Sequence, residues 1–131
     1  MKIGLLEDDI AIQEMLTLVF QSEGYVITIY PTAKDCLDAL LQPGLEQGLP
    51  IDLLIVDWRL AGSAPGTEVI RTLRDNPLFA TIPIILTTAA TIQNTEELQY
   101  LHVALLQKPF AVDEIVNLTK GLVQPGTLAE G

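Results

Sequence analysis

The stretch Ile3-Gly4-Leu5-Leu6-Glu7-Asp8-Asp9 decides the fold of this chain, because a short apolar run ends abruptly in three carboxylates. A second apolar run, Leu53-Leu54-Ile55-Val56, ends in the same way on Asp57. Short apolar runs bounded by polar residues are typical of the buried strands of a parallel sheet. Carboxylates gathered at one edge of such a sheet repel one another, which is costly unless the site handles a cation or a phosphoryl group. This concentration of negative charge is the first indication of function.

The composition predicts a single domain with its own core. The chain has 131 residues, of which 49% are hydrophobic, and its formal net charge is −10. Only 7 residues are Lys or Arg, so direct binding of nucleic acid is not expected on this chain. We expect the domain to span residues 1–123 and residues 124–131 to form a flexible C-terminal tail.

The single cysteine, Cys36, lies in an apolar helical stretch and has no partner for an intrachain disulfide. We interpret it as a buried structural thiol. The sequence has no signal-peptide pattern and no run of membrane-spanning length, so we expect no membrane contact and a cytoplasmic location.

Strand and helix patterns alternate along the chain. Apolar runs predict five strands, at residues 3–6, 25–30, 53–57, 82–88 and 103–107. Helical periodicity predicts four later helices at about 32–41, around 69–73, at about 95–101 and over 112–122. The first helix, which Gly24 ends, has an apolar side made of Ala11, Ile12, Met15, Leu16, Leu18, Val19 and Phe20. The alternation predicts an α/β doubly wound parallel sheet with helices on both faces, since parallel strands need crossover connections.

Polar side chains follow four of the predicted strands. These clusters are Glu7-Asp8, Asp57, Thr87-Thr88 and Lys108-Pro109. In a doubly wound sheet the site lies beyond the carboxyl ends of the strands, near the point where the strand order reverses. The four clusters are therefore predicted to meet at one edge of the sheet.

Four pieces of the chain resemble the receiver domains of two-component response regulators. They are Leu5-Leu6-Glu7-Asp8-Asp9, Asp52-Leu53-Leu54-Ile55-Val56-Asp57-Trp58, Pro83-Ile84-Ile85-Leu86-Thr87-Thr88-Ala89 and Lys108-Pro109-Phe110. Each piece alone is a weak signal, but the four in order form a specific signature that covers nearly the whole chain. The resemblance implies a flavodoxin-like fold, in which a five-stranded parallel sheet of order 2-1-3-4-5 is covered by five helices.

The residue types fit phosphoryl chemistry. An aspartate carboxylate can attack a phosphoryl group and hold it as an acyl phosphate, and Asp57 is the candidate phosphoacceptor. Neutralising the phosphoryl oxygens calls for a divalent cation, and we expect Mg²⁺. Asp8 and Asp57 would be direct ligands and Glu7 would act through a water, while the resemblance adds the backbone carbonyl of Arg59.

A fixed ammonium and a hydroxyl complete the expected site. Lys108 would pair with one phosphoryl oxygen, and Thr88 would donate its hydroxyl to another and draw the following loop inward. Ala89 is small, which leaves the phosphodonor a way in. Asp9 is interpreted chiefly as the N-cap of the first helix, and His102 as a surface or helix-end histidine.

Some features depart from the family pattern. The proline common after the phosphoacceptor loop is missing at Ala61, and the turn to Gly66 looks one residue longer. The customary Gly-Ala before the fifth strand is replaced by Leu101-His102, and a short fourth helix is expected. Leu105 stands where most relatives have an aromatic residue that swings inward on activation. We therefore expect an output route that uses backbone displacement instead of a ring.

The leading hypothesis is a regulatory phosphoacceptor, not a classical enzyme: a sensor histidine kinase or a phosphotransfer protein phosphorylates Asp57, and the receiver assists its own phosphorylation and hydrolysis. A Mg²⁺-dependent aspartyl phosphohydrolase would need a second aspartate where Arg59 stands. A pseudo-receiver, which interacts without phosphorylation, would not need the full set of acidic, Thr and Lys residues. The sequence leaves open an effector domain outside this chain and a homodimer.

Overall fold

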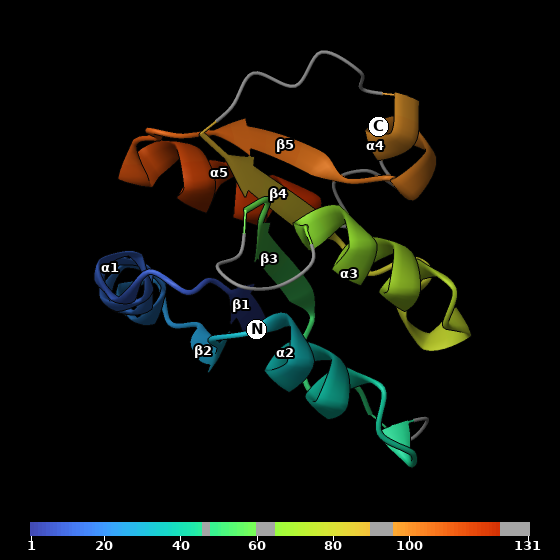
Figure 1. Ribbon diagram of the computed structural model, residues 1–131. Helices are drawn as coiled ribbons and strands as arrows, with labels where there is room; N and C mark the ends of the chain where they lie inside the picture. The colour runs from blue at the N-terminus through green and yellow to red at the C-terminus, as the bar shows by residue number, and fades with distance from the viewer. Residues whose placement is uncertain (46–47, 60–64, 90–95, 124–131) are drawn as a thin grey trace, which may run out of the picture.

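The computed structural model describes residues 1–45, 48–59, 65–89 and 96–123. Five parallel strands form one sheet in the order β2-β1-β3-β4-β5 (Figure 1). The strands are β1 (Lys2–Leu6), β2 (Val26–Tyr30), β3 (Leu53–Asp57), β4 (Ile84–Thr88) and β5 (Ala104–Gln107). The predicted flavodoxin-like order is confirmed, and the strand order reverses between β1 and β3.

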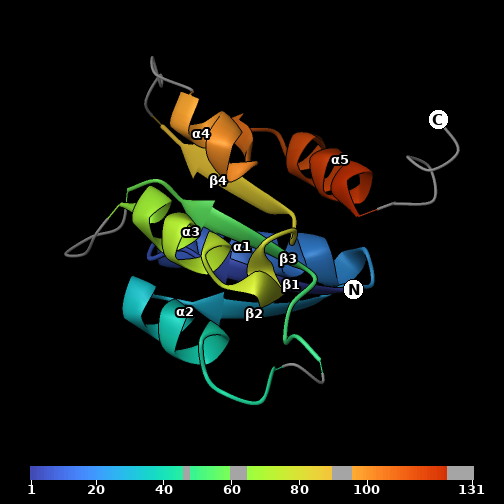
Figure 2. The same ribbon diagram turned by 90° about the vertical axis from the view of Figure 1, so that its right-hand side faces the viewer.

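Helices cover both faces of the sheet, as the alternating pattern predicts. They are α1 (Ile10–Ser22), α2 (Ala33–Leu40), α3 (Gly66–Arg74), α4 (Glu96–Leu101) and α5 (Val112–Leu122), with a short 3-10 helix, η2 (Pro77–Phe79). Helices α1 and α5 lie on one face and α2 and α3 on the other, with α4 beside α3 (Figure 1). The sheet is therefore the middle of three layers (Figure 1). In the view turned by 90°, which looks onto the face covered by α2 and α3, α3 lies in front of the strands and α1 behind them (Figure 2).

The central strands alternate between two apolar cores. Leu54 and Val56 of β3 pack in the core under α2 and α3, whereas Leu53 and Ile55 pack in the core under α1 and α5. All residues of β3 are buried. A strand buried on both sides has no polar face, which explains why this stretch of sequence is continuously apolar.

The register of the sheet brings the strand ends together. Leu6 lies opposite Val56, and Asp57 lies opposite Thr87. The residues that follow β1 and β5 therefore emerge at the same edge as the last residues of β3 and β4, as predicted.

The structure corrects the predicted face of α1. Leu16 and Phe20 are buried, but Ala11 is exposed and Leu18 is 70% exposed. Apolar residues occupy most of the circumference of this helix, so periodicity alone could not select the packed side. The fourth strand begins at Ile84, two residues later than predicted, because the short helix η2 and its following turn precede it.

Some predictions concern residues outside the described part of the chain. The lengthened turn falls largely on residues 60–64, the expected start of the fourth helix on Thr95, and the expected tail on residues 124–131. Within the described residues, helix α4 comprises 6 residues, and the predicted short length of the fourth helix stays a prediction. Among the described residues, no helix has the length and apolar character needed to cross a bilayer.

Candidate functional site

Glu7 is the buried acidic residue that follows β1, and it is 2% exposed. Its backbone carbonyl accepts a 2.6 Å hydrogen bond from Gln13 Nε2, and its Oε2 accepts a 3.2 Å bond from the Asp9 N–H. Asp9 Oδ1 accepts from the Ile12 N–H at 3.2 Å, so the predicted N-cap is confirmed. These bonds fix the turn from β1 into α1. Sequence reasoning missed Gln13, since a polar residue within a helix gives no sign of reaching back to the preceding strand.

Asp57 ends β3 and is 7% exposed. The Trp58 N–H donates to the carbonyl of Thr87 at 2.7 Å, and the Gly66 N–H donates to the carbonyl of Trp58 at 2.8 Å. Helix α3 begins so close to β3 that a Cβ on residue 66 would collide with the carbonyl oxygen of Asp57. Glycine at this position therefore permits the close approach of α3 to the site.

Lys108 reaches the acidic residues from the end of β5. Its Nζ lies 3.3 Å from Glu7 Oε1 and 3.3 Å from Asp57 Oδ1. Its backbone N–H donates to the carbonyl of Thr88 at 2.6 Å, and its peptide bond to Pro109 is cis. One ammonium thus joins carboxylates that belong to two different strand ends.

Burial and charge set the electrostatics of this group. The pKa of Glu7 is raised to about 7, chiefly by burial and next by the charge of Asp57, against the lowering effects of the Asp9 N–H and of Lys108. Burial alone would lower the pKa of Lys108, but the two carboxylates raise it overall. The lysine therefore stays charged at neutral pH, while Glu7 titrates close to neutral pH.

The acidic cluster offers oxygen ligands for a hard cation. One carboxylate oxygen from each of Glu7, Asp8 and Asp57 lies within 4.8 Å of the others. Asp8 is exposed and the other two are buried, so solvent reaches the cluster from the Asp8 side. Carboxylate oxygens suit Mg²⁺, and at this spacing their charges need compensation. The residues present therefore fit a divalent cation.

A pocket of about 350 Å³ adjoins the phosphoacceptor candidate. It is lined by Asp57, Trp58, Arg59, Thr88, Ala89 and Lys108. Thr88 is 2% exposed, whereas Arg59 is exposed. The structure thus brings every predicted site residue to one edge of the sheet, and the roles assigned to them stay predictions.

Three residues outside the site were singled out in the sequence. Cys36 is fully buried, and burial raises the pKa of its thiol to about 12, which fits a structural thiol. His102 is exposed and directly follows α4. Its φ of 56° lies in the left-handed region, where glycine is the usual residue. Leu105 is 41% exposed on β5.

Comparison with known proteins gives a family match over most of the chain. A family model described as the response regulator receiver domain matches residues 3–120. The phosphate regulon transcriptional regulatory protein PhoB of Rhizobium meliloti is 29% identical, over 94% of this chain and 52% of its own length. PhoB of Pseudomonas aeruginosa is 28% identical, over 92% of this chain and 50% of its own length. The chain spans about half the length of these curated relatives.

Solved structures share the fold. Chemotaxis protein CheY4 of Vibrio cholerae matches with a TM-score of 0.79 at 19% identity, covering 93% of this chain and 98% of that protein. Response regulator TrrA of Thermotoga maritima, solved with Mg²⁺ and BeF, matches with a TM-score of 0.75 at 26% identity, covering 93% and 98%. The matched range contains nearly all of the sheet and the positions of the predicted site residues. The chain therefore belongs to the response regulator receiver domain family of two-component systems.

Proposed function

We propose that this receiver domain is a Mg²⁺-dependent phosphoacceptor switch that a histidine kinase or a phosphotransfer protein phosphorylates on Asp57. The observation that carries the proposal is the position of Lys108 Nζ, 3.3 Å from carboxylate oxygens of both Glu7 and Asp57. An ammonium held beside a buried carboxylate can pass to a phosphoryl oxygen when the carboxylate is phosphorylated. Response regulator TrrA, which shares the fold of this chain, was solved in complex with Mg²⁺ and BeF, and this supports the inclusion of Mg²⁺ in the proposal.

The residues of the chain divide the work of the transfer. A carboxylate oxygen of Asp57 attacks the phosphorus and forms an O–P bond, while the N–P bond of the donor phosphohistidine breaks. The leaving imidazole nitrogen keeps the electron pair and takes up a proton. Lys108 and the Thr88 hydroxyl would each bind one oxygen of the transferred group, and Ala89 leaves room for the donor.

Glu7, Asp8 and Asp57, with the backbone carbonyl of Arg59, would hold the Mg²⁺ ion. When bound, the ion supplies positive charge that neutralises the phosphoryl oxygens. A phosphoryl group on Asp57 would draw Thr88 inward and so alter a surface read by a partner or an effector domain. DNA binding is not proposed for this chain, whose net charge is −10.

Phosphorylation with acetyl phosphate and Mg²⁺ tests the proposal. Intact-mass measurement should show one added phosphoryl group on the wild type and none on Asp57→Asn. Asp38→Asn is the matched control, because Asp38 lies on α2, exposed and paired with Lys34 at 2.6 Å. Undiminished labelling of Asp57→Asn would overturn the assignment of Asp57, and no labelling of the wild type would favour a pseudo-receiver.

A further inference from the structure

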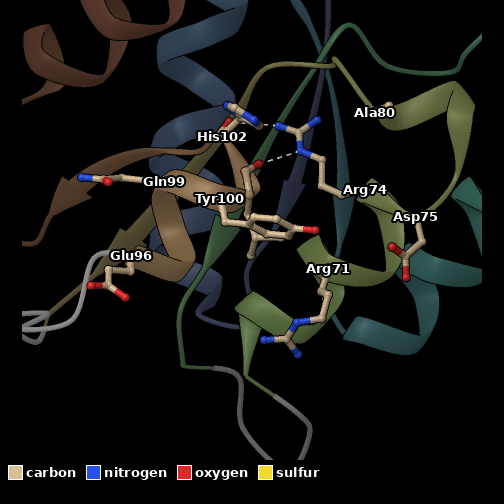
Figure 3. A pocket seen from close by; sticks show the side chains of 9 residues that line it. Arg71, Arg74, Asp75, Ala80, Glu96, Gln99, Tyr100 and His102 are labelled. Carbon is tan, nitrogen blue, oxygen red and sulfur yellow. Dashed lines mark hydrogen bonds between the residues drawn. The ribbon is translucent and has the colours of Figure 1, made fainter.

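Arg74, the last residue of α3, lies beside a pocket of about 650 Å³ between α3 and α4 (Figure 3). Within the described part of the chain, its guanidinium donates four hydrogen bonds, all to backbone carbonyl oxygens. An arginine has five N–H donors, so these bonds use most of its capacity. Arg74 is therefore a cross-link within the fold and not a group offered to a ligand in the pocket.

The four carbonyls belong to two segments. Arg74 Nη1 donates to Phe79 at 2.7 Å and to Ile82 at 2.8 Å, just before β4. Nε donates to Leu101 at 2.8 Å and Nη2 to His102 at 3.1 Å, at the end of α4. A cation is favourable at a helix C-terminus, where the free carbonyls concentrate negative charge. Arg74 thus joins α3, the start of β4 and the end of α4 at one point.

The C-terminal end of α4 is also closed by its own backbone. The Val103 N–H donates to the carbonyl of Leu98 at 3.3 Å, and the His102 N–H donates to the carbonyl of Gln99 at 3.2 Å. With the left-handed conformation of His102, this pairing is a Schellman motif. Leu101 is 2% exposed, so this end is also packed into the core. Isolated short helices are marginal in water, so these contacts contribute to holding the described part of α4, Glu96–Leu101, in place.

The two ends of β4 have different surroundings. Its last residue, Thr88, lines the pocket beside Asp57, whereas the segment before its first residue is bound by Arg74. Helix α4 follows Thr88 in the chain, and its C-terminal end is bound by Arg74. A displacement of Thr88 is therefore transmitted along the backbone to the N-terminal end of α4.

We propose that Arg74 is the fixed point of the switch. When Thr88 is displaced, α4 turns about its anchored end at Leu101, while α3 and the start of β4 keep their places. This inference rests on the proposed function, because a phosphoryl group on Asp57 is what displaces Thr88. Arg74 is a positioning residue in this scheme, since it touches none of the reacting groups.

Hydrogen exchange of the unphosphorylated protein tests the anchor. Arg74→Met keeps a straight apolar stem and removes every donor, so the amides of His102 and Val103 should exchange at least about tenfold faster than in the wild type. The amides of α1 should change far less. Arg71→Met is the matched control, since Arg71 is exposed one turn earlier on α3 and lines the same pocket. Equal exchange in Arg74→Met and the wild type would overturn the anchor.

Amide chemical shifts with and without beryllofluoride and Mg²⁺ test the fixed point. In the wild type, changes should be large at Thr88 and at the start of α4 and small over 101–103. In Arg74→Met, changes of similar size should reach residues 101–103, because the end of the helix can then move as well. A merely structural arginine would lower stability and leave the pattern of shift changes as in the wild type, which would overturn the proposal.

The two proposals fail in different ways. If beryllofluoride changes no chemical shift at Thr88 in the wild type, the proposed function and the role of Arg74 as a fixed point are both wrong. The hydrogen-exchange experiment still tests whether Arg74 anchors the end of α4. If Arg74→Met does not fold, Arg74→Lys replaces it, since lysine keeps the charge with fewer donors. Arg74→Lys should then give faster exchange at His102 and larger shift changes over 101–103 than the wild type, and wild-type values in both would overturn the proposal.

Discussion

At the scale of single residues, burial and the charges of its neighbours together set the protonation of Glu7. Its pKa in the folded protein, about 7, lies above the ordinary 4.5 of the unfolded chain. The folded protein therefore binds the Glu7 proton more tightly, and this contribution to stability is complete below about pH 4.5 and is lost as the pH rises through about 7. Because each tenfold change in proton affinity is worth about 1.4 kcal/mol, the loss is at most about 4 kcal/mol.

The prediction for Glu7 concerns the metal-free protein. Urea unfolding in EDTA should show stability falling from about pH 5 to about pH 8, and Glu7→Gln should flatten this fall because the amide does not titrate. At the alkaline end, Glu7→Gln should be the more stable protein. An equally steep fall in Glu7→Gln would mean that another group titrates.

His102 gives a second prediction at this scale. Its φ of 56° places a side chain in a conformation that costs about 1 kcal/mol for residues other than glycine. His102→Gly should therefore raise the free energy of unfolding by up to about 1 kcal/mol, and the Arg74 bond, which uses the backbone carbonyl, should persist. His102→Ala is the control and should bring no gain. A glycine variant no more stable than the alanine variant would contradict the strain argument.

At the scale of elements, α5 contains a defect that can be repaired. Thr119 is fully buried, and its Oγ1 has no hydrogen-bond partner among the described residues. A buried hydroxyl without a partner costs about 1 kcal/mol or more, so Thr119→Val should stabilise the protein by about that amount in urea unfolding. Thr119→Ser, which keeps the hydroxyl and loses the methyl group, should destabilise it. Loss of stability in the valine variant would point to a hidden partner.

The fifth strand tests the expected output route. Leu105 is 41% exposed and its neighbour Leu106 is 9% exposed. Leu105→Ala should cost under about 1 kcal/mol and leave the beryllofluoride-induced shifts of the α4 amides unchanged, whereas the control Leu106→Ala should cost about 2 kcal/mol or more. If Leu105→Ala abolished the shift changes in α4, this leucine would have to transmit the signal in place of an aromatic ring.

The elements differ in how far sequence could predict them. Strands β1 and β3 could be placed because they are continuous apolar runs that end in carboxylates, and the site followed from the strand order. The packed side of α1 could not, because Leu18 and Phe20 are equally apolar. Gly66 and Arg74 depend on which segments approach each other in three dimensions. Their sequence neighbourhoods contain no sign of the carbonyls they meet.

At the scale of the whole molecule, we predict that the acidic cluster makes stability depend on Mg²⁺. Glu7, Asp8 and Asp57 repel one another in the metal-free protein, and a bound cation stabilises the folded state by mass action, by about 2.7 kcal/mol at a hundred times its Kd. Mg²⁺ should therefore raise the Tm of the wild type and of Asp38→Asn, and Asp8→Asn should respond much less. Equal responses in all three would place the ion elsewhere.

The same titration has an internal reporter. Trp58 is the single tryptophan of the chain, and it lines the pocket beside Asp57. Its fluorescence should change with Mg²⁺ in the wild type and change little in Asp8→Asn. A reporter inside the pocket separates binding at the site from binding elsewhere on an acidic surface.

The lysine that lies between two carboxylates links distant parts of the chain. Lys108 is 101 residues from Glu7 and 51 residues from Asp57 in sequence, yet it lies within 3.3 Å of both. No fragment that lacks the first or the last strand can assemble this group, because its members come from both ends of the domain. Only molecules in which the complete sheet has formed would then accept a phosphoryl group. Misfolded copies of such a domain would therefore not be phosphorylated and would carry no signal.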